Sequence, residues 1–206
     1  MSKGLKDLTL KDILYGIVVP VVIGLVIIAF PLGEGFLTSI EPALVGIFVF
    51  GLQEQIMIVV VPMMFGLLWN RWAGGASGFL LGSIYALWYA IYGISAGPWW
   101  TSDISLLGYL LSGMLVGYMS GALNQQSRTF SRMLFAGLTS GIVGGLFLFL
   151  TMQLSPMHLV YGAYGLFITI TPRVTFGILV PVFAKIFIRY GITPDKIMAE
   201  VKPNAK

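Results

Sequence analysis

The sequence predicts an all-α integral membrane protein, a six-transmembrane-helix bundle with an outer interfacial or broken-helix segment at residues 34–55. Three observations predict this fold class: an apolar composition, apolar runs long enough to span a membrane, and an uneven placement of basic residues. Of the 206 residues, 57% are hydrophobic and only 10% are charged, whereas soluble domains average about 25% charged residues. A single domain, residues 1–206, is expected, with a short cytoplasmic segment 1–11 and a cytoplasmic tail 191–206.

The apolar runs recur along the whole chain and have the length needed to cross a hydrocarbon core about 30 Å thick. Turn-forming stretches such as Asn70-Arg71-Trp72 and Ser155-Pro156 separate them. The predicted spans cover about 12–31, 56–69 (alternatively from near 42), 74–95, 104–123, 130–153 and 172–190.

The basic residues predict the orientation, because loops on the cytoplasmic side retain lysine and arginine. With a cytoplasmic amino terminus and six crossings, eleven of the twelve basic residues lie at cytoplasmic ends, and Arg173 is the exception. Both termini are therefore expected in the cytoplasm, and the protein in the cell membrane.

Residues 34–55 decide the number of crossings. If they formed a seventh span, Arg71 would face outward and the later loops would invert. Apolar stretches of about 10–14 residues are more often interfacial or re-entrant than spanning. Residues 34–55 are expected to be re-entrant, interfacial or the start of one long, broken second helix.

Small residues four positions apart predict the contact faces of the helices, since helices in lipid associate by close van der Waals approach. Three spans carry such stripes: Gly74, Gly78, Gly82, Ala86 and Ala90; Gly113, Gly117 and Gly121; Gly137, Gly141 and Gly145. The first span has Gly16, Pro20 and Gly24 on an otherwise bulky surface. This pattern is typical either of a lipid-facing helix or of a face that docks a membrane partner.

The sequence motifs of enzymes are missing. The chain has one histidine and no cysteine, and it carries no H-E-x-x-H, G-x-S-x-G or Walker A sequence. We therefore expect no enzymatic activity, no metal and no cofactor, and any ATP would be bound by partner subunits.

Aromatic and ionisable residues gather on the predicted outer side. An interfacial aromatic belt is one interpretation, although belts usually ring both interfaces. The alternative is a pocket in which rings stack on a solute and a few charges select it. The candidate substrate-binding residues are Trp99, Trp100, Asp103, Tyr89, Tyr92, Tyr164, Glu41, Glu54 and His158.

Arg173 is the most informative single residue, because ionisable side chains at membrane depth indicate a functional site. Thr171-Pro172 is a typical helix start, which predicts that the last helix begins there, with Arg173 in its first turn at the outer mouth. The helix dipole and the guanidinium would then favour a carboxylate or phosphate group of a solute. The alternative is a salt bridge to Asp103, Glu41 or Glu54.

Three stretches together resemble a known family: "VVVPMMFGLLWNRWAGGASGFLLGSIYALWYAIYG", "ISLLGYLLSGMLVGYMSGAL" and "TPRVTFGILVPVFAKIFIRYG". The chain resembles the substrate-binding S components of energy-coupling factor (ECF) transporters, six-helix membrane proteins that capture vitamins and similar micronutrients. The resemblance implies a transmembrane coupling subunit and cytoplasmic ATPase subunits as partners. It also implies docking through an A-x-x-x-A face of the first helix, for which Gly16, Pro20 and Gly24 are the nearest equivalent here.

The resulting functional hypothesis is a membrane-embedded solute-binding subunit of an ECF-type importer that captures a vitamin-like or other ring-containing solute at the outer face. The alternatives are a small secondary transporter or channel that works alone, and a membrane scaffold protein without a solute. The partners expected are the solute, the coupling and ATPase subunits and the lipid bilayer, with no nucleic acid.

Overall fold

The computed structural model describes residues 17–29, 52–96, 104–155 and 162–191, and within these ranges the chain is helical apart from short turns. Four helices are long and apolar enough to cross a membrane: α7 (Arg71–Ala96), α8 (Ser105–Asn124), α9 (Phe130–Gln153) and α10 (Gly162–Arg189). The predicted class, a helical membrane protein, is therefore confirmed.

Two shorter helical segments complete the described part. Helix α2 (Val19–Ala29) belongs to the predicted first span. The second span is one continuous helix made of α5 (Gln53–Gln55), a π-helical stretch η5 (Ile56–Val60) and α6 (Val61–Leu68). The described residues of the segment 34–55 thus belong to a helix that continues into the predicted second span. Residues 34–51 lie outside the described residues.

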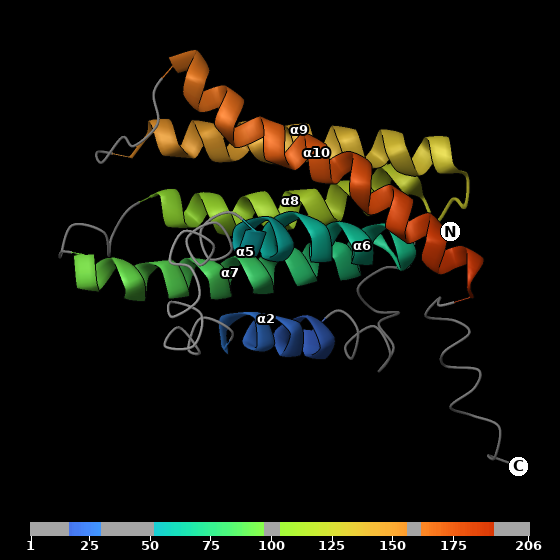
Figure 1. Ribbon diagram of the computed structural model, residues 1–206, viewed down its shortest axis with the longest axis horizontal. Coiled ribbons are helices and arrows are strands. Elements are labelled where there is room, and N and C mark those ends of the chain that lie inside the picture. Colours follow the sequence, from blue (N-terminus) through green and yellow to red (C-terminus); the bar gives the residue numbers. More distant parts are fainter. Residues whose placement is uncertain (1–16, 30–51, 97–103, 156–161, 192–206) are drawn as a thin grey trace, which may run out of the picture.

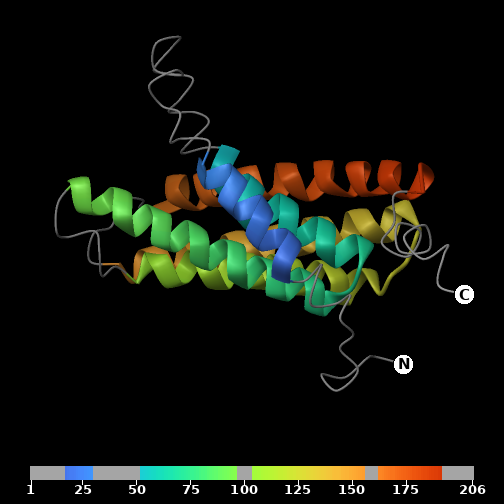
Figure 2. The same cartoon turned by 90° about the horizontal axis from the view of Figure 1, so that it is seen from below.

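The helices form layers around a central one (Figure 1). Helix α8 packs against α7 on one side and against α9 on the other, and α10 packs on α9. The helix α5–η5–α6 fills the space between α7, α8 and α10. Helix α2 contacts α7 at the edge of the bundle and crosses it obliquely in Figure 2.

Local hydrogen bonds define the turns at one end of the bundle. The side-chain Oδ1 of Asn70 accepts the backbone N–H groups of Trp72 and Ala73, at 2.9 and 2.8 Å, and so caps the start of α7. Gln125 and Gln126 have positive φ angles of 50° and 59° and end α8. Both turns were predicted from the sequence, one at Asn70-Arg71-Trp72 and the other between the predicted spans 104–123 and 130–153. Helix α7 begins within the first of them, at Arg71.

The glycine stripes lie at the helix crossings, as predicted. A Cβ atom added at Gly78 of α7 would lie 2.0 Å from the carbonyl oxygen of Gly113 on α8. On the other side of the bundle, a Cβ atom at Gly137 of α9 would lie 2.3 Å from the carbonyl oxygen of Gly177 on α10. These backbones approach so closely that no side chain can lie between them.

This close approach predicts a position-specific loss of stability. Gly78→Ala is expected to destabilise the fold by about 1–3 kcal/mol, because the new methyl group must separate α7 from α8. Phe79→Ala is a matched control that creates the same residue at the next position, on an exposed side chain. Thermal unfolding in detergent should show a lower midpoint for Gly78→Ala only; equal midpoints would contradict the crossing.

The start of α10 differs from the prediction. The helix begins at Gly162 and not near 172, and Pro172 lies inside it. Thr171 and Pro172 resemble a helix start in water, but in lipid an interrupted helix exposes backbone groups that water cannot satisfy. The apolar residues before Thr171 therefore stay helical, and Arg173 lies about 16 Å along the helix from Gly162, at 1.5 Å per residue.

Candidate functional site

A buried ion pair joins the second span to the last helix. Arg173 Nη2 of α10 donates a hydrogen bond to Glu54 Oε1 of α5 at 2.5 Å. The side chain of Arg173 is 2% exposed and that of Glu54 is 16% exposed. Within the described ranges Glu54 is the only acidic residue, so no other described carboxylate can neutralise Arg173.

The arginine is positioned by α9 and α10 together. Gly145 of α9 lacks a side chain where the Cδ atom of Arg173 passes, and an added Cβ atom would lie 3.2 Å from it. Arg173 Nη1 donates to the carbonyl oxygen of Thr169 at 2.8 Å. Thr169 lies four residues before Arg173, one turn back on α10. The guanidinium therefore folds back along its own helix.

Such a pair is a costly feature of a membrane protein. Desolvating two charges takes several kcal/mol per ion, and their attraction repays this only with good geometry and further hydrogen bonds. Ionisable residues inside membranes usually belong to substrate, ion or proton pathways. The pair is therefore a candidate functional centre and a poor candidate for a simple stabilising device.

Aromatic rings of α7 and α8 lie beside the pair. The ring of Tyr85 lies 5.1 Å from that of Tyr109, edge to face, and 6.3 Å from that of Tyr89, stacked, measured between centroids. Tyr85 and Tyr109 belong to one buried cluster with Met57 and Ile58 of η5, the stretch that follows Glu54 and Gln55 on the same helix. The three rings, together with Trp88, form the apolar side of the centre.

Polar atoms without partners occur on the same two helices, α5 and α10. Gln53 is 0% exposed, and neither its Nε2 nor its Oε1 atom has a hydrogen-bond partner within the described part of the chain. Gln55 Oε1 and Arg173 Nε also lack one there. We call Gln53, Glu54, Gln55, Arg173, Tyr85, Tyr89 and Tyr109 the polar–aromatic cluster.

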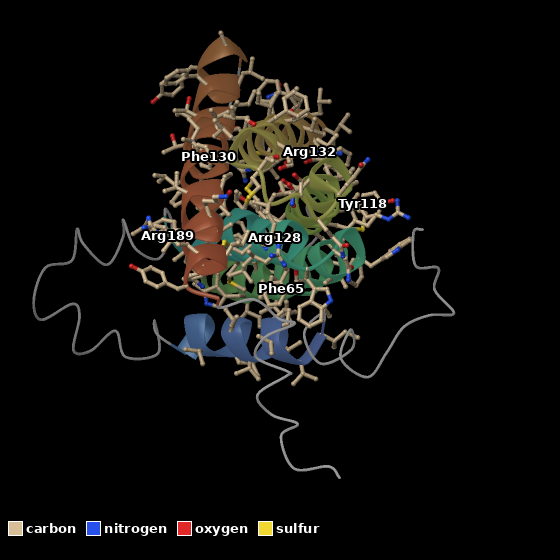
Figure 3. All side chains as sticks on the ribbon, turned by 90° about the vertical axis from the view of Figure 1, so that its right-hand side faces the viewer. Phe65, Tyr118, Arg128, Phe130, Arg132 and Arg189 are labelled. Carbon is tan, nitrogen blue, oxygen red and sulfur yellow. The ribbon has the colours of Figure 1, made fainter. Side chains whose placement is uncertain are left out.

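The opposite pole of the molecule is basic. Arg128, Arg132 and Arg189 lie at the end shown in Figure 3. Lys185, which bonds to Arg128, and Arg71, which lies over the ring of Tyr118, belong to the same end. These five are all the described basic residues except Arg173. Lys185 Nζ donates to the carbonyl oxygen of Arg128 at 2.8 Å, which ties α10 to the turn between α8 and α9. Arg71 lies over the rings of Trp72 and Tyr118, at 5.4 and 5.9 Å.

The cluster lies far from this basic end. Arg173 precedes Arg189 by about 24 Å along α10, and Tyr109 precedes Asn124 by about 22 Å along α8. Glu54 precedes Leu68 by about 21 Å along the second span. The three distances are similar, so the cluster lies at one level of the bundle. If the basic end lies at one surface of a hydrocarbon core about 30 Å thick, this level lies near the other surface.

The structure brings together three of the residues predicted to bind the solute: Arg173, Glu54 and Tyr89. Tyr164 is 74% exposed on the first turn of α10 and lies outside the cluster, so its predicted stacking role is not supported. Tyr92 belongs to α7, and its side chain is not described. The remaining candidates lie outside the described residues: Trp99, Trp100, Asp103, Glu41 and His158.

One detail of the sequence-based site needs correction. Arg173 is not in a first helical turn, because α10 begins earlier. Its guanidinium pairs with Glu54, and its binding of an anionic solute group stays a prediction. The predicted alternative, a salt bridge to Glu54, is the arrangement found.

The small-residue face of the first span packs inside the chain. Pro20 and Gly24 are buried, and a Cβ atom added at Gly24 would lie 2.8 Å from Leu81 and 3.2 Å from Ile84 of α7. The face of Gly24 is therefore occupied by α7 within the chain, and docking of a partner through Pro20 and Gly24 stays a prediction. Gly16 lies outside the described residues.

Sequence reasoning missed Gln53, Gln55 and Tyr109 as members of the site, and it placed Tyr85 only among the aromatic residues of the predicted outer side. The signal for the glutamines was present: "QEQ" interrupts an otherwise apolar stretch, and polar residues within apolar helices indicate function. Tyr109 gave no such signal, because its position is set by the packing of α8 against α7.

The fold and the site define a class, a helical membrane protein with a buried ion pair between two of its helices. Among the described residues no group of three or more histidine, aspartate or glutamate side chains could hold a metal ion. Comparisons with protein-family models, with curated proteins and with solved structures give no match to this chain.

Proposed function

We propose that this chain is a membrane-embedded solute-binding subunit that works like the S component of an ECF-type importer. The observation that carries the proposal is the polar–aromatic cluster, in which a buried ion pair adjoins unpartnered amide groups and tyrosine rings. Binding sites for small molecules combine these two elements, an apolar lining and a few placed polar groups.

The topology that we propose has six crossings in the cell membrane, with both termini in the cytoplasm and residues 34–51 on the outer side. The five basic residues at one end support this orientation, because positive residues stay on the cytoplasmic side. The cluster then lies in the outer half of the membrane, where a solute arrives. The solute would be vitamin-like or another small ring compound.

Partner subunits belong to the same proposal. An importer of this kind needs a transmembrane coupling subunit and cytoplasmic ATPases, since this sequence has no nucleotide-binding motif of its own. The first helix would dock on the coupling subunit. Because Pro20 and Gly24 face α7, the face left for docking carries Val18, Val22 and Leu25, which are exposed.

A reconstitution experiment separates this function from its rivals. The purified chain in liposomes should bind a solute taken up from a cell extract but should not accumulate it, even with a proton or sodium gradient. Accumulation by the chain alone would contradict the proposal and favour a secondary transporter. Absence of any bound small molecule would favour a scaffold protein.

A further inference from the structure

The polar–aromatic cluster has hydrogen-bonding capacity that the described residues leave unused. Gln53 offers one amide donor group and one carbonyl acceptor, Gln55 offers Oε1 as an acceptor, and Arg173 offers the Nε–H donor. A buried polar group without a partner is unfavourable, and membrane interiors supply no water to reduce this penalty. The carboxamide of Gln53, fully buried with both of its polar atoms unpartnered, therefore indicates a site that a polar molecule completes.

The charge of the cluster restricts what that molecule can be. Arg173 and Glu54 form a one-to-one pair, and the other polar side chain that reaches Glu54 is the neutral Gln55, whose Nε2 lies 3.5 Å from Glu54 Oε1. An anionic solute would have to compete with Glu54 for the guanidinium, and a cation would have to compete with Arg173 for the carboxylate. Adding a third charge to a weakly solvated site is unfavourable, so the arrangement selects against charged groups.

The geometry of an amide selects among neutral groups. A carboxamide presents N–H and C=O side by side, and the complementary partner is a cis-amide edge with its own adjacent N–H and C=O. Lactams, ureides and pyrimidinones carry this edge on a flat ring. The rings of Tyr85, Tyr89 and Tyr109 pack with Met57 and Ile58, one turn after Gln53 on the same helix, and suit a flat, uncharged body.

We propose that the solute of this site is an uncharged ring compound with a cis-amide edge, which the carboxamide of Gln53 recognises by two hydrogen bonds. This inference rests on the proposed solute-binding function and adds the chemical class. It replaces the anionic group that the sequence alone suggested for Arg173.

The test uses 2-pyridone, which has the cis-amide edge, with N-methyl-2-pyridone and benzoate as rings of similar size. Titration calorimetry of the purified chain in detergent should show 2-pyridone binding, with N-methyl-2-pyridone and benzoate at least about tenfold weaker, because the first has no N–H donor and the second carries a charge. Gln53→Met, which keeps the length of the side chain, should weaken 2-pyridone by about tenfold or more. Gln126→Met, the same change at the basic end, should leave it unchanged.

Stability gives a second readout of Gln53. Without a solute, Gln53→Met should unfold at a higher temperature than the wild type, since it removes two buried groups without described partners. A lower unfolding temperature would show that Gln53 is paired in the solute-free protein and would overturn the inference.

The outcomes separate the inference from the proposed function. If benzoate binds more tightly than 2-pyridone, or if Gln53→Met leaves 2-pyridone binding unchanged, the cis-amide class is wrong although a solute site can exist. The same holds if a molecule without a cis-amide edge copurifies with the chain while 2-pyridone does not bind. If no probe binds and no small molecule copurifies, both the inference and the proposed function fail.

Discussion

Replacing Arg173 with methionine is expected to destabilise the folded protein by about 3–5 kcal/mol, because the change leaves the Glu54 carboxylate buried without its partner. Glu54→Met should have a similar effect, since it leaves the guanidinium unpaired beside Gly145. Thermal unfolding in detergent measures both changes. Arg132→Met removes a basic residue that bonds a backbone carbonyl at the basic end and serves as the control, with an expected loss well below that of either variant.

The double variant distinguishes pairing from two independent roles. Buried ion pairs replaced as a whole by apolar residues are often neutral or even stabilising. Glu54→Met combined with Arg173→Met should therefore recover most of the stability that each single change removes. Additive losses in the double variant would show that the two residues are not energetically coupled.

The local features of the fold could be predicted well from the sequence. Helices α7, α8 and α9 begin and end within a few residues of the predicted spans, because hydropathy and turn residues act locally. The glycine stripes were also found where helices cross, since only small residues allow that approach. The predicted start of the last helix was wrong, because Thr171-Pro172 is a helix-start signal in water that the membrane environment overrides.

The site was predictable only in part, because its geometry is not local. Arg173 and Glu54 each stood out as charges in apolar surroundings, but their pairing joins positions far apart in the chain. The sequence could not choose between a solute anion and Glu54 as the partner of Arg173. The sequence also could not tell whether the small residues of the first span contact a helix of the same chain or of a partner, because small residues favour any close contact; Gly24 packs on α7.

The second large effect that we expect concerns solute binding and uses the same double variant. Glu54→Met with Arg173→Met should keep the fold, but it removes the unpartnered Nε–H donor of Arg173 from the polar–aromatic cluster. An uncharged solute that hydrogen-bonds to this donor as well as to Gln53 should therefore bind more weakly while the protein stays intact. Loss of binding without loss of stability is the signature of a functional centre. If the pair had only a structural role, the double variant would bind the solute as the wild type does.

The most direct measurement is mass spectrometry of the small molecules that copurify with the wild type and with the double variant, both isolated from the same cells in a mild detergent. The unfolding temperature of each sample shows that equal amounts of folded protein are compared. We predict a solute in the wild-type sample and a loss of at least about tenfold in the double variant. The same solute in equal amount on both proteins, or none on the wild type, would contradict a solute-binding function for this cluster.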